Sequence, residues 1–126
     1  MSPVRHAVSG PAISFTLEEE MQLVRRELAT ASARIARTLV KMGPLRVTLV
    51  GIRAGGSLHE HTSPGPVTIH VLEGAMEVVT REKTWPLPAG ALLSLDAGVP
   101  HAVESTHGSL FLLTVVTPAQ DEPRAT

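Results

Sequence analysis

The sequence contains no cysteine, so disulfide bonds, thiolate zinc sites, iron–sulfur clusters and cysteine nucleophiles are all excluded. Aromatic residues make up only 2% of the chain, which leaves too few rings for a base-stacking surface. The 11 basic and 12 acidic residues are scattered and give a net charge of -1, so no basic surface for nucleic acid or membrane is expected. Any bound metal ion must therefore be held by His, Asp or Glu.

Long apolar runs are also missing. No stretch approaches the roughly 18 consecutive apolar residues of a membrane-spanning helix, and residues 1–10 lack the apolar centre of a signal peptide. These absences predict a cytoplasmic protein. The chain has 126 residues, of which 43% are hydrophobic, and this length and composition suit one compact domain with its own core.

One amphipathic helix is predicted over about residues 16–30. Thr16 and Glu19 have the spacing of a capping box, in which each side chain bonds a backbone N–H at the start of a helix. Apolar residues then recur every three or four positions among charged ones. These are Leu17, Met21, Val24 and Leu28. The apolar stripe can pack on a sheet or on a second subunit.

From residue 33 the pattern changes to short runs rich in Val, Leu, Ile and Thr, separated by Gly and Pro turns. Strands are predicted at 34–41, 45–53, 67–73, 75–81, 84–87, 91–95, 101–105 and 109–117. Many short strands without helices between them predict an all-β sandwich or closed barrel. The single domain is expected over 15–117, with a flexible N-terminal tail at 1–14 and a C-terminal tail at 118–126.

Four of the six histidines lie in or beside the predicted strands. They are His59, His61, His70 and His101. His59 and His61 are two residues apart, so in an extended segment both imidazoles leave the same face, about 6 to 7 Å apart along the strand. One metal ion can bridge that distance. His101 follows Pro100, which restricts the backbone just before a predicted strand.

The segment around His101 resembles the second motif of the cupin family, G-x5-P-x-G-x2-H-x3-N. Gly90, Gly98 and His101 fall on the motif without a gap, while Asp96 stands in the proline place and Ser105 in the asparagine place. The first motif, G-x5-H-x-H-x3,4-E-x6-G, fits in two registers. The gap-free register uses Gly55, His61, Ser63, Val67 and Gly74 in that order.

In the other register His59 and His61 form the H-x-H pair, with a shorter spacing before it and a longer loop after it. His61 is a motif histidine in both registers. Neither register keeps the glutamate of the motif, because residues 62–72 contain no Asp or Glu. This is the main departure from the family pattern.

The resemblance covers about residues 33–117 and is closest to the small single-domain "cupin 2, conserved barrel" proteins. It implies a double-stranded β-helix (jelly-roll) barrel with one N-terminal helix, and a homodimer. It further implies a metal site of His59, His61 and His101. Three neutral imidazoles would suit a divalent transition metal such as Fe, Ni, Zn or Cu better than Mg or Ca, which prefer oxygen ligands.

Three functions are compatible with these residues. The first is a metal-dependent dioxygenase or isomerase of a small organic substrate, since three-histidine centres occur in family members that activate oxygen. The second is a ligand-binding or sensor barrel without turnover. The third is a metal-free structural barrel. No catalytic residue is assigned.

For the other polar residues, a structural or surface role is an alternative to a functional role. His70 is expected to point outward by counting along the strand from Val67, although a bulge could turn it inward as a fourth ligand. Glu60 and Glu104 are either solvent-facing charges or groups that support the histidines. Three arginines could bind an anionic substrate but are more simply surface residues, namely Arg46, Arg53 and Arg81. Two histidines outside the strands are expected in solvent, namely His6 and His107.

Overall fold

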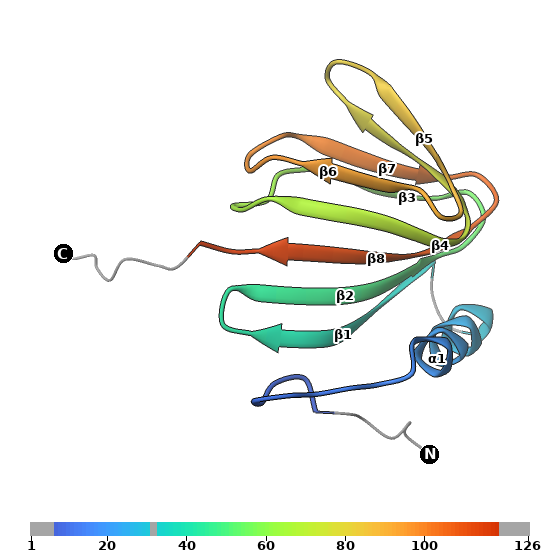
Figure 1. Cartoon of the computed structure of the whole chain (residues 1–126). Coiled ribbons are helices and arrows are strands. Elements are labelled where there is room, and N and C mark those ends of the chain that lie inside the picture. The colour runs from blue at the N-terminus through green and yellow to red at the C-terminus, as the bar shows by residue number, and fades with distance from the viewer. Residues whose placement is uncertain (1–6, 31–32, 119–126) are drawn as a thin grey trace.

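The computed structural model describes residues 7–30 and 33–118, which form one helix and a curled antiparallel sheet (Figure 1). The helix α1 spans Leu17–Thr30 and is followed along the chain only by strands. The strands are β1 (Arg34–Met42), β2 (Leu45–Ile52), β3 (Gly56–His61), β4 (Val67–Thr80), β5 (Thr84–Pro88), β6 (Leu92–Leu95), β7 (His101–Ser105) and β8 (Ser109–Val116). The all-β prediction with one N-terminal helix is confirmed, and the sheet curls into a half-barrel.

The helix begins where the sequence predicts. The carbonyl of Thr16 accepts hydrogen bonds from the backbone N–H groups of Glu19 and Glu20, at 3.1 and 3.2 Å. Three consecutive glutamates in the first turn, Glu18 to Glu20, place negative charge at the positive end of the helix dipole. Both local effects favour a helix start at this point.

The strand order is β1-β2-β8-β4-β7-β3, with β5 and β6 also paired to β4. The first half of β4 pairs with β6 and β8, and its second half pairs with β5 and β7. The prediction of two separate strands at 67–73 and 75–81 is therefore wrong, because one strand passes through both halves of the fold.

Gly74 explains why β4 bends without ending. Its φ is 74°, in the left-handed region, and a Cβ there would lie 2.1 Å from the carbonyl oxygen of Gly108. A glycine is needed for this conformation and this close approach. The pairing register with β8 shifts between Val71 and Glu73, so the strand kinks at a bulge and continues.

The strand β3 is absent from the sequence prediction. It contains histidines, serine and glutamate in place of the β-branched residues that mark a strand, and it forms by pairing with β7. Its presence is a consequence of long-range pairing, which local residue preferences do not encode.

The barrel interior is filled with aliphatic side chains. In β4, burial alternates, so that Val67, Ile69 and Val71 face the interior. They join a cluster that includes residues of β2, β5, β6, β7 and β8, with Phe111 among its largest members. Burial of each such side chain stabilises the fold by about 1.5 to 3 kcal/mol.

The helix α1 packs on the opposite, outer face of the sheet. Val24 and Met21 are buried there against Leu49 and Leu110. A Cβ on Gly51 would lie 2.6 Å from side-chain atoms of Leu28 and Val24, so the helix rests directly on the backbone of β2. The apolar stripe predicted from the sequence therefore covers one part of this outer face.

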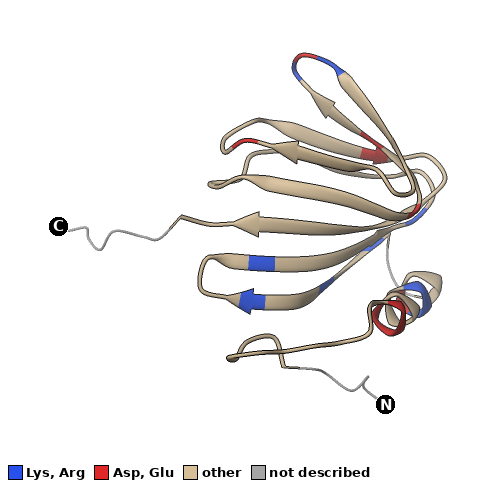
Figure 2. Ribbon diagram, viewed as in Figure 1, with Lys and Arg blue, Asp and Glu red and all other residues tan. Residues whose placement is uncertain are grey.

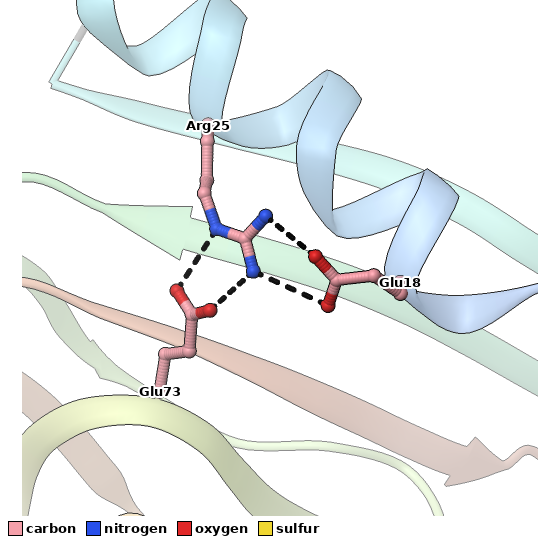
Figure 3. A network of polar contacts seen from close by, with 3 residues as sticks. All are labelled: Glu18, Arg25 and Glu73. Atoms are coloured by element: carbon pink, nitrogen blue, oxygen red, sulfur yellow. Dashed lines mark hydrogen bonds and ion pairs between the residues drawn. The ribbon is translucent and has the colours of Figure 1, made fainter.

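Charged residues connect α1 to the sheet at two points. Glu20 accepts a 2.5 Å hydrogen bond from Nε of Arg37 on β1, with 9% and 15% of the two side chains exposed. At the second point, Arg25 of α1 lies between Glu18 of the same helix and Glu73 of β4 (Figure 3). Figure 2 shows that charged residues are otherwise sparse on the sheet, and β6 and β8 carry none.

Part of the predicted tails lies outside the described residues, namely 1–6 and 119–126. Next to the first of these segments, the carbonyl of Val8 accepts a 2.7 Å hydrogen bond from the N–H of Lys41 on β1. No helix in the described part of the chain is long and apolar enough to cross a membrane.

Candidate metal centre

His101 opens β7 and points into the barrel. Burial alternates along β7, and His101, Val103 and Ser105 are its buried residues. Val103 belongs to the interior cluster, so His101, which is 2% exposed, shares the inward face with it. The imidazole of His101 is thus buried on the face of β7 that points to the aliphatic interior.

His61 lies opposite His101 because of an irregularity in β3. Leu58 pairs with Val103, and His61 pairs with His101, so three steps along β3 match two steps along β7. In a regular pairing, Glu60 would have faced His101. The extra residue reverses the alternation of β3 and places the two imidazoles 4.3 Å apart between ring centroids, inclined at 57°.

Backbone carbonyls orient both rings. Nδ1 of His61 lies 2.8 Å from the carbonyl oxygen of His59, and Nδ1 of His101 lies 2.9 Å from that of Val99. A carbonyl oxygen can only accept a hydrogen bond, so each Nδ1 carries the proton and donates it. In a neutral imidazole this leaves the lone pair on Nε2, which is the arrangement found in metal-bound histidines.

The third predicted ligand, His59, is not gathered with the other two. Its side chain is exposed, like that of His61, but the ring contact in the site joins only His61 and His101, and the carbonyl of His59 orients His61. The expectation that His59 and His61 leave one face assumes a regular strand, and the register shift interrupts β3 between Leu58 and His61. Within residues 7–30 and 33–118, no three His, Asp or Glu side chains lie close enough together to hold a metal ion.

His70 is on the outer face of the sheet, as the count from Val67 predicts. It lies between the inward-facing Ile69 and Val71 and pairs with Leu92 of β6 and Leu112 of β8. A sheet therefore separates its imidazole from the barrel interior. Val67 itself is 2% exposed in the core, so an aliphatic side chain occupies the inward place of the motif glutamate.

The two glutamates beside the histidines also face away from the pair. Glu60 is exposed and accepts a 3.2 Å hydrogen bond from Nε of Arg81. Glu104 alternates with the inward-facing Val103 and Ser105 and lies opposite Glu77 on β4. Neither carboxylate is positioned to act as a base at the imidazoles.

Thr80 is a neighbour of the pair that sequence reasoning missed. It lies directly opposite His101 in the pairing of β4 with β7, so the histidine has Thr80 on one side and His61 on the other. Its hydroxyl donates to the carbonyl of Lys83 at 2.9 Å and lies 3.3 Å from Nε1 of Trp85, which donates to it. No local pattern marks this residue, because its position depends on the register of distant strands.

Ser105, in the asparagine place of the second motif, is a structural residue. It is 1% exposed, and its hydroxyl lies 3.0 Å from the carbonyl oxygen of Ala75 and 2.9 Å from the hydroxyl of Ser109. These hydrogen bonds connect β7 with β4 and β8 just below the bend at Gly74. They fix the strand that carries His101.

Comparison with known proteins agrees with this architecture. A family model described as "Cupin domain" matches residues 48–116, which include both motif segments. This chain belongs to the cupin family. A conserved protein of unknown function from Streptococcus pyogenes is 30% identical with a TM-score of 0.64, and the match covers 68% of this chain and 75% of that one.

Other solved structures show the same fold. A cupin 2 conserved barrel domain protein from Leptotrichia buccalis is 30% identical, with a TM-score of 0.63, over 67% of this chain and 41% of that one. Salicylate 1,2-dioxygenase from Pseudoaminobacter salicylatoxidans is 20% identical, with a TM-score of 0.75, over 89% of this cupin and 35% of the dioxygenase. At that identity the likeness concerns the fold alone. No curated protein sequence matched the chain.

Proposed function

We propose that this cupin binds a divalent transition metal ion through His61 and His101 and uses the ion to hold a small organic ligand. The observation that supports the proposal is the pairing of the buried His101 imidazole with the exposed His61 imidazole, each donating from Nδ1 to a backbone carbonyl and each left with a lone pair on Nε2. Two such donors fit Fe, Ni, Zn or Cu.

Two histidine ligands alone do not complete the coordination of a metal ion, and His59 is the proposed third ligand. It belongs to the irregular part of β3, and its carbonyl already contacts His61. Its imidazole would have to turn inward through a local change of the bulge. With neutral ligands and valine in place of the motif glutamate, a bound ion would keep its full charge and polarise a ligand oxygen more strongly.

The enzymatic form of this proposal is oxygenation or isomerisation of the ligand. Salicylate 1,2-dioxygenase shares the fold and is the reason to test oxygenation first. A second candidate is binding or sensing without turnover. It is favoured by the orientation of Glu60 and Glu104, which leaves the imidazoles without a neighbouring carboxylate base in the described part of the chain.

Elemental analysis of the untagged protein tests metal binding. We expect about one transition metal ion per chain after reconstitution, and its loss in His61→Ala and His101→Ala. His70→Ala is the matched control, because it removes an imidazole from the outer face of the same barrel. Absence of metal in the wild-type protein would leave a metal-free barrel, and equal loss in His70→Ala would contradict the assignment of the metal to His61 and His101.

Oxygen consumption then separates the two candidates. The metal-loaded protein is supplied with salicylate and with other small hydroxy acids while oxygen is recorded. Oxygen uptake that disappears in His101→Ala supports the dioxygenase. A ligand that raises the unfolding temperature of the loaded protein without consuming oxygen supports a binding barrel.

We also propose that the protein is a homodimer. Leu92 and Val116 are 65% and 42% exposed, and both alternate with inward-facing residues, so they lie on the outer face of the sheet. A second copy covering this face would remove them from water.

A further inference from the structure

A cavity lies outside the barrel, between α1 and the ends of the neighbouring strands. Its volume is about 410 Å³. Leu28 and Ala29 of α1 and Leu110 of β8 provide apolar wall, while Arg53, next after β2, and His107, in the turn before β8, bring polar groups to it. Because Leu110 packs with the outer cluster, the sheet separates this cavity from the His61–His101 pair.

An ion pair between Glu73 and Arg25 forms one wall of the cavity. Glu73 accepts hydrogen bonds on both carboxylate oxygens from Arg25, one of them from Nε at 3.1 Å (Figure 3). The same guanidinium also donates to Glu18 at 3.0 Å. These hydrogen bonds, chiefly that with Glu73, raise the pKa of Arg25. The carboxylate of Glu73 is thus compensated, and this wall adds little charge to the cavity.

Unlike Arg25 and Glu73, the other two ionisable side chains of the cavity, Arg53 and His107, are not paired with each other or with another residue of the described part of the chain. In the part of the chain that the structure describes, no hydrogen bond or ion pair occupies either side chain, and both line the cavity. A guanidinium presents its N–H groups in a planar fork that matches a carboxylate. The lining therefore combines an uncommitted cation and an imidazole with an aliphatic surface.

We propose that this cavity binds a small organic carboxylate with an apolar body. The carboxylate pairs with Arg53 and approaches His107, and the apolar body lies against Leu28, Ala29 and Leu110. Removal of apolar surface from water and a charge-assisted hydrogen bond together supply the affinity. The site is separate from the barrel interior and does not depend on the proposed metal ion.

The test is a titration of the full-length ¹⁵N-labelled protein with hexanoate, followed by NMR chemical shifts. We expect saturable shifts of residues around the cavity, and much weaker shifts with hexanamide, which has the same apolar body without the charge. Arg53→Gln should weaken hexanoate binding roughly tenfold, the loss expected for a charge-assisted hydrogen bond. Arg46→Gln is the matched control, since Arg46 is exposed on β2 and does not line the cavity.

Three further variants make the result independent of the folding of Arg53→Gln. Ala29→Glu places a negative charge on the cavity wall and should abolish hexanoate binding, while Ala29→Gln, of similar size, should retain it. His61→Ala should bind hexanoate as the wild-type protein does, because the metal site is not involved. Equal binding of hexanamide, equal weakening by Arg46→Gln, loss of binding in His61→Ala, or no saturable shifts would each overturn the proposal.

Discussion

Two backbone carbonyls determine the chemistry that His61 and His101 can perform. By accepting the Nδ1 protons, the carbonyls of His59 and Val99 leave Nε2 of each ring as the basic nitrogen. The same rings without these carbonyls would exchange tautomers and present either nitrogen. The identity of the two motif histidines could be read from the sequence, but the orientation of their rings could not, because it depends on main-chain atoms two residues earlier.

The ion pair between Glu20 and Arg37 illustrates how burial decides the contribution of a charge. We predict that Arg37→Met destabilises the protein by about 3 kcal/mol, since it removes the positive charge facing a carboxylate that is almost completely buried. Arg81→Met is the control: its ion pair with Glu60 is 77% and 52% exposed and should contribute less than about 1 kcal/mol. Urea unfolding of both variants measures the difference, and equal losses would contradict the prediction.

The carboxyl group of Glu18 makes the stability of the fold depend on pH in the acid range. Its hydrogen bond with Arg25 holds the pKa of this carboxyl below its ordinary value of 4.5. Because the folded pKa is the lower one, the stabilisation is present above pH 4.5 and is lost as the pH falls through the folded pKa.

We predict that Glu18→Gln reduces the loss of stability between about pH 5 and about pH 3. Glu19→Gln, from the same helical turn, should leave the profile nearer to that of the wild-type protein. Urea unfolding midpoints across this range provide the measurement. A steeper acid loss in Glu18→Gln than in the wild-type protein would show that the linkage has the opposite sign.

At the scale of elements, two irregular strands build the site. β3 brings His61 opposite His101 through one extra residue, and β4 bends at Gly74 so that one strand serves both halves of the barrel. The helix and most strand positions could be predicted, because their patterns are local. Both irregularities depend on pairing with β7 and β8, so the sequence suggested a break at Gly74, omitted β3, and placed His59 with His61.

The bend in β4 can be tested with a pair of glycine substitutions. Gly74→Ala adds a Cβ that meets the carbonyl of Gly108, whereas Gly90→Ala, at a φ of 91°, meets nothing within 4 Å. Both substitutions suffer the strain of a positive φ, and only the first also displaces backbone. We predict that Gly74→Ala loses more stability, by about 1 to 3 kcal/mol beyond Gly90→Ala. Thermal unfolding of the two variants decides the matter, and similar losses would show that β4 and the Gly108 turn separate easily.

At the scale of the molecule, the curled sheet has two faces with different occupants. The inner face carries the aliphatic core and His101, with the exposed His61 beside it, and the outer face carries α1, the Arg53 cavity and the exposed Leu92. The cupin family was recognisable from the spacing of its second motif. The outer cavity was not, because Arg25, Arg53 and His107 are far apart in the sequence and meet only in the fold.

The open outer face leads to a prediction about assembly. Size-exclusion chromatography with light scattering should give the mass of a dimer, and Leu92→Asp should shift it towards the monomer, because burial of an unpaired carboxylate is costly. Leu92→Asp should leave thermal stability at low protein concentration nearly unchanged, since this side chain is 65% exposed. Elution of the wild-type protein as a monomer would contradict the predicted dimer.

The most direct test of the histidine pair is X-ray absorption spectroscopy of the protein reconstituted with zinc or nickel. The account predicts imidazole nitrogen ligands at about 2.0 to 2.1 Å from the metal. His101→Ala should lose the bound metal, and His59→Ala shows whether the third imidazole takes part. A metal ion surrounded only by water oxygens, or a spectrum unchanged in both His61→Ala and His101→Ala, would contradict the claim that this pair is the metal centre.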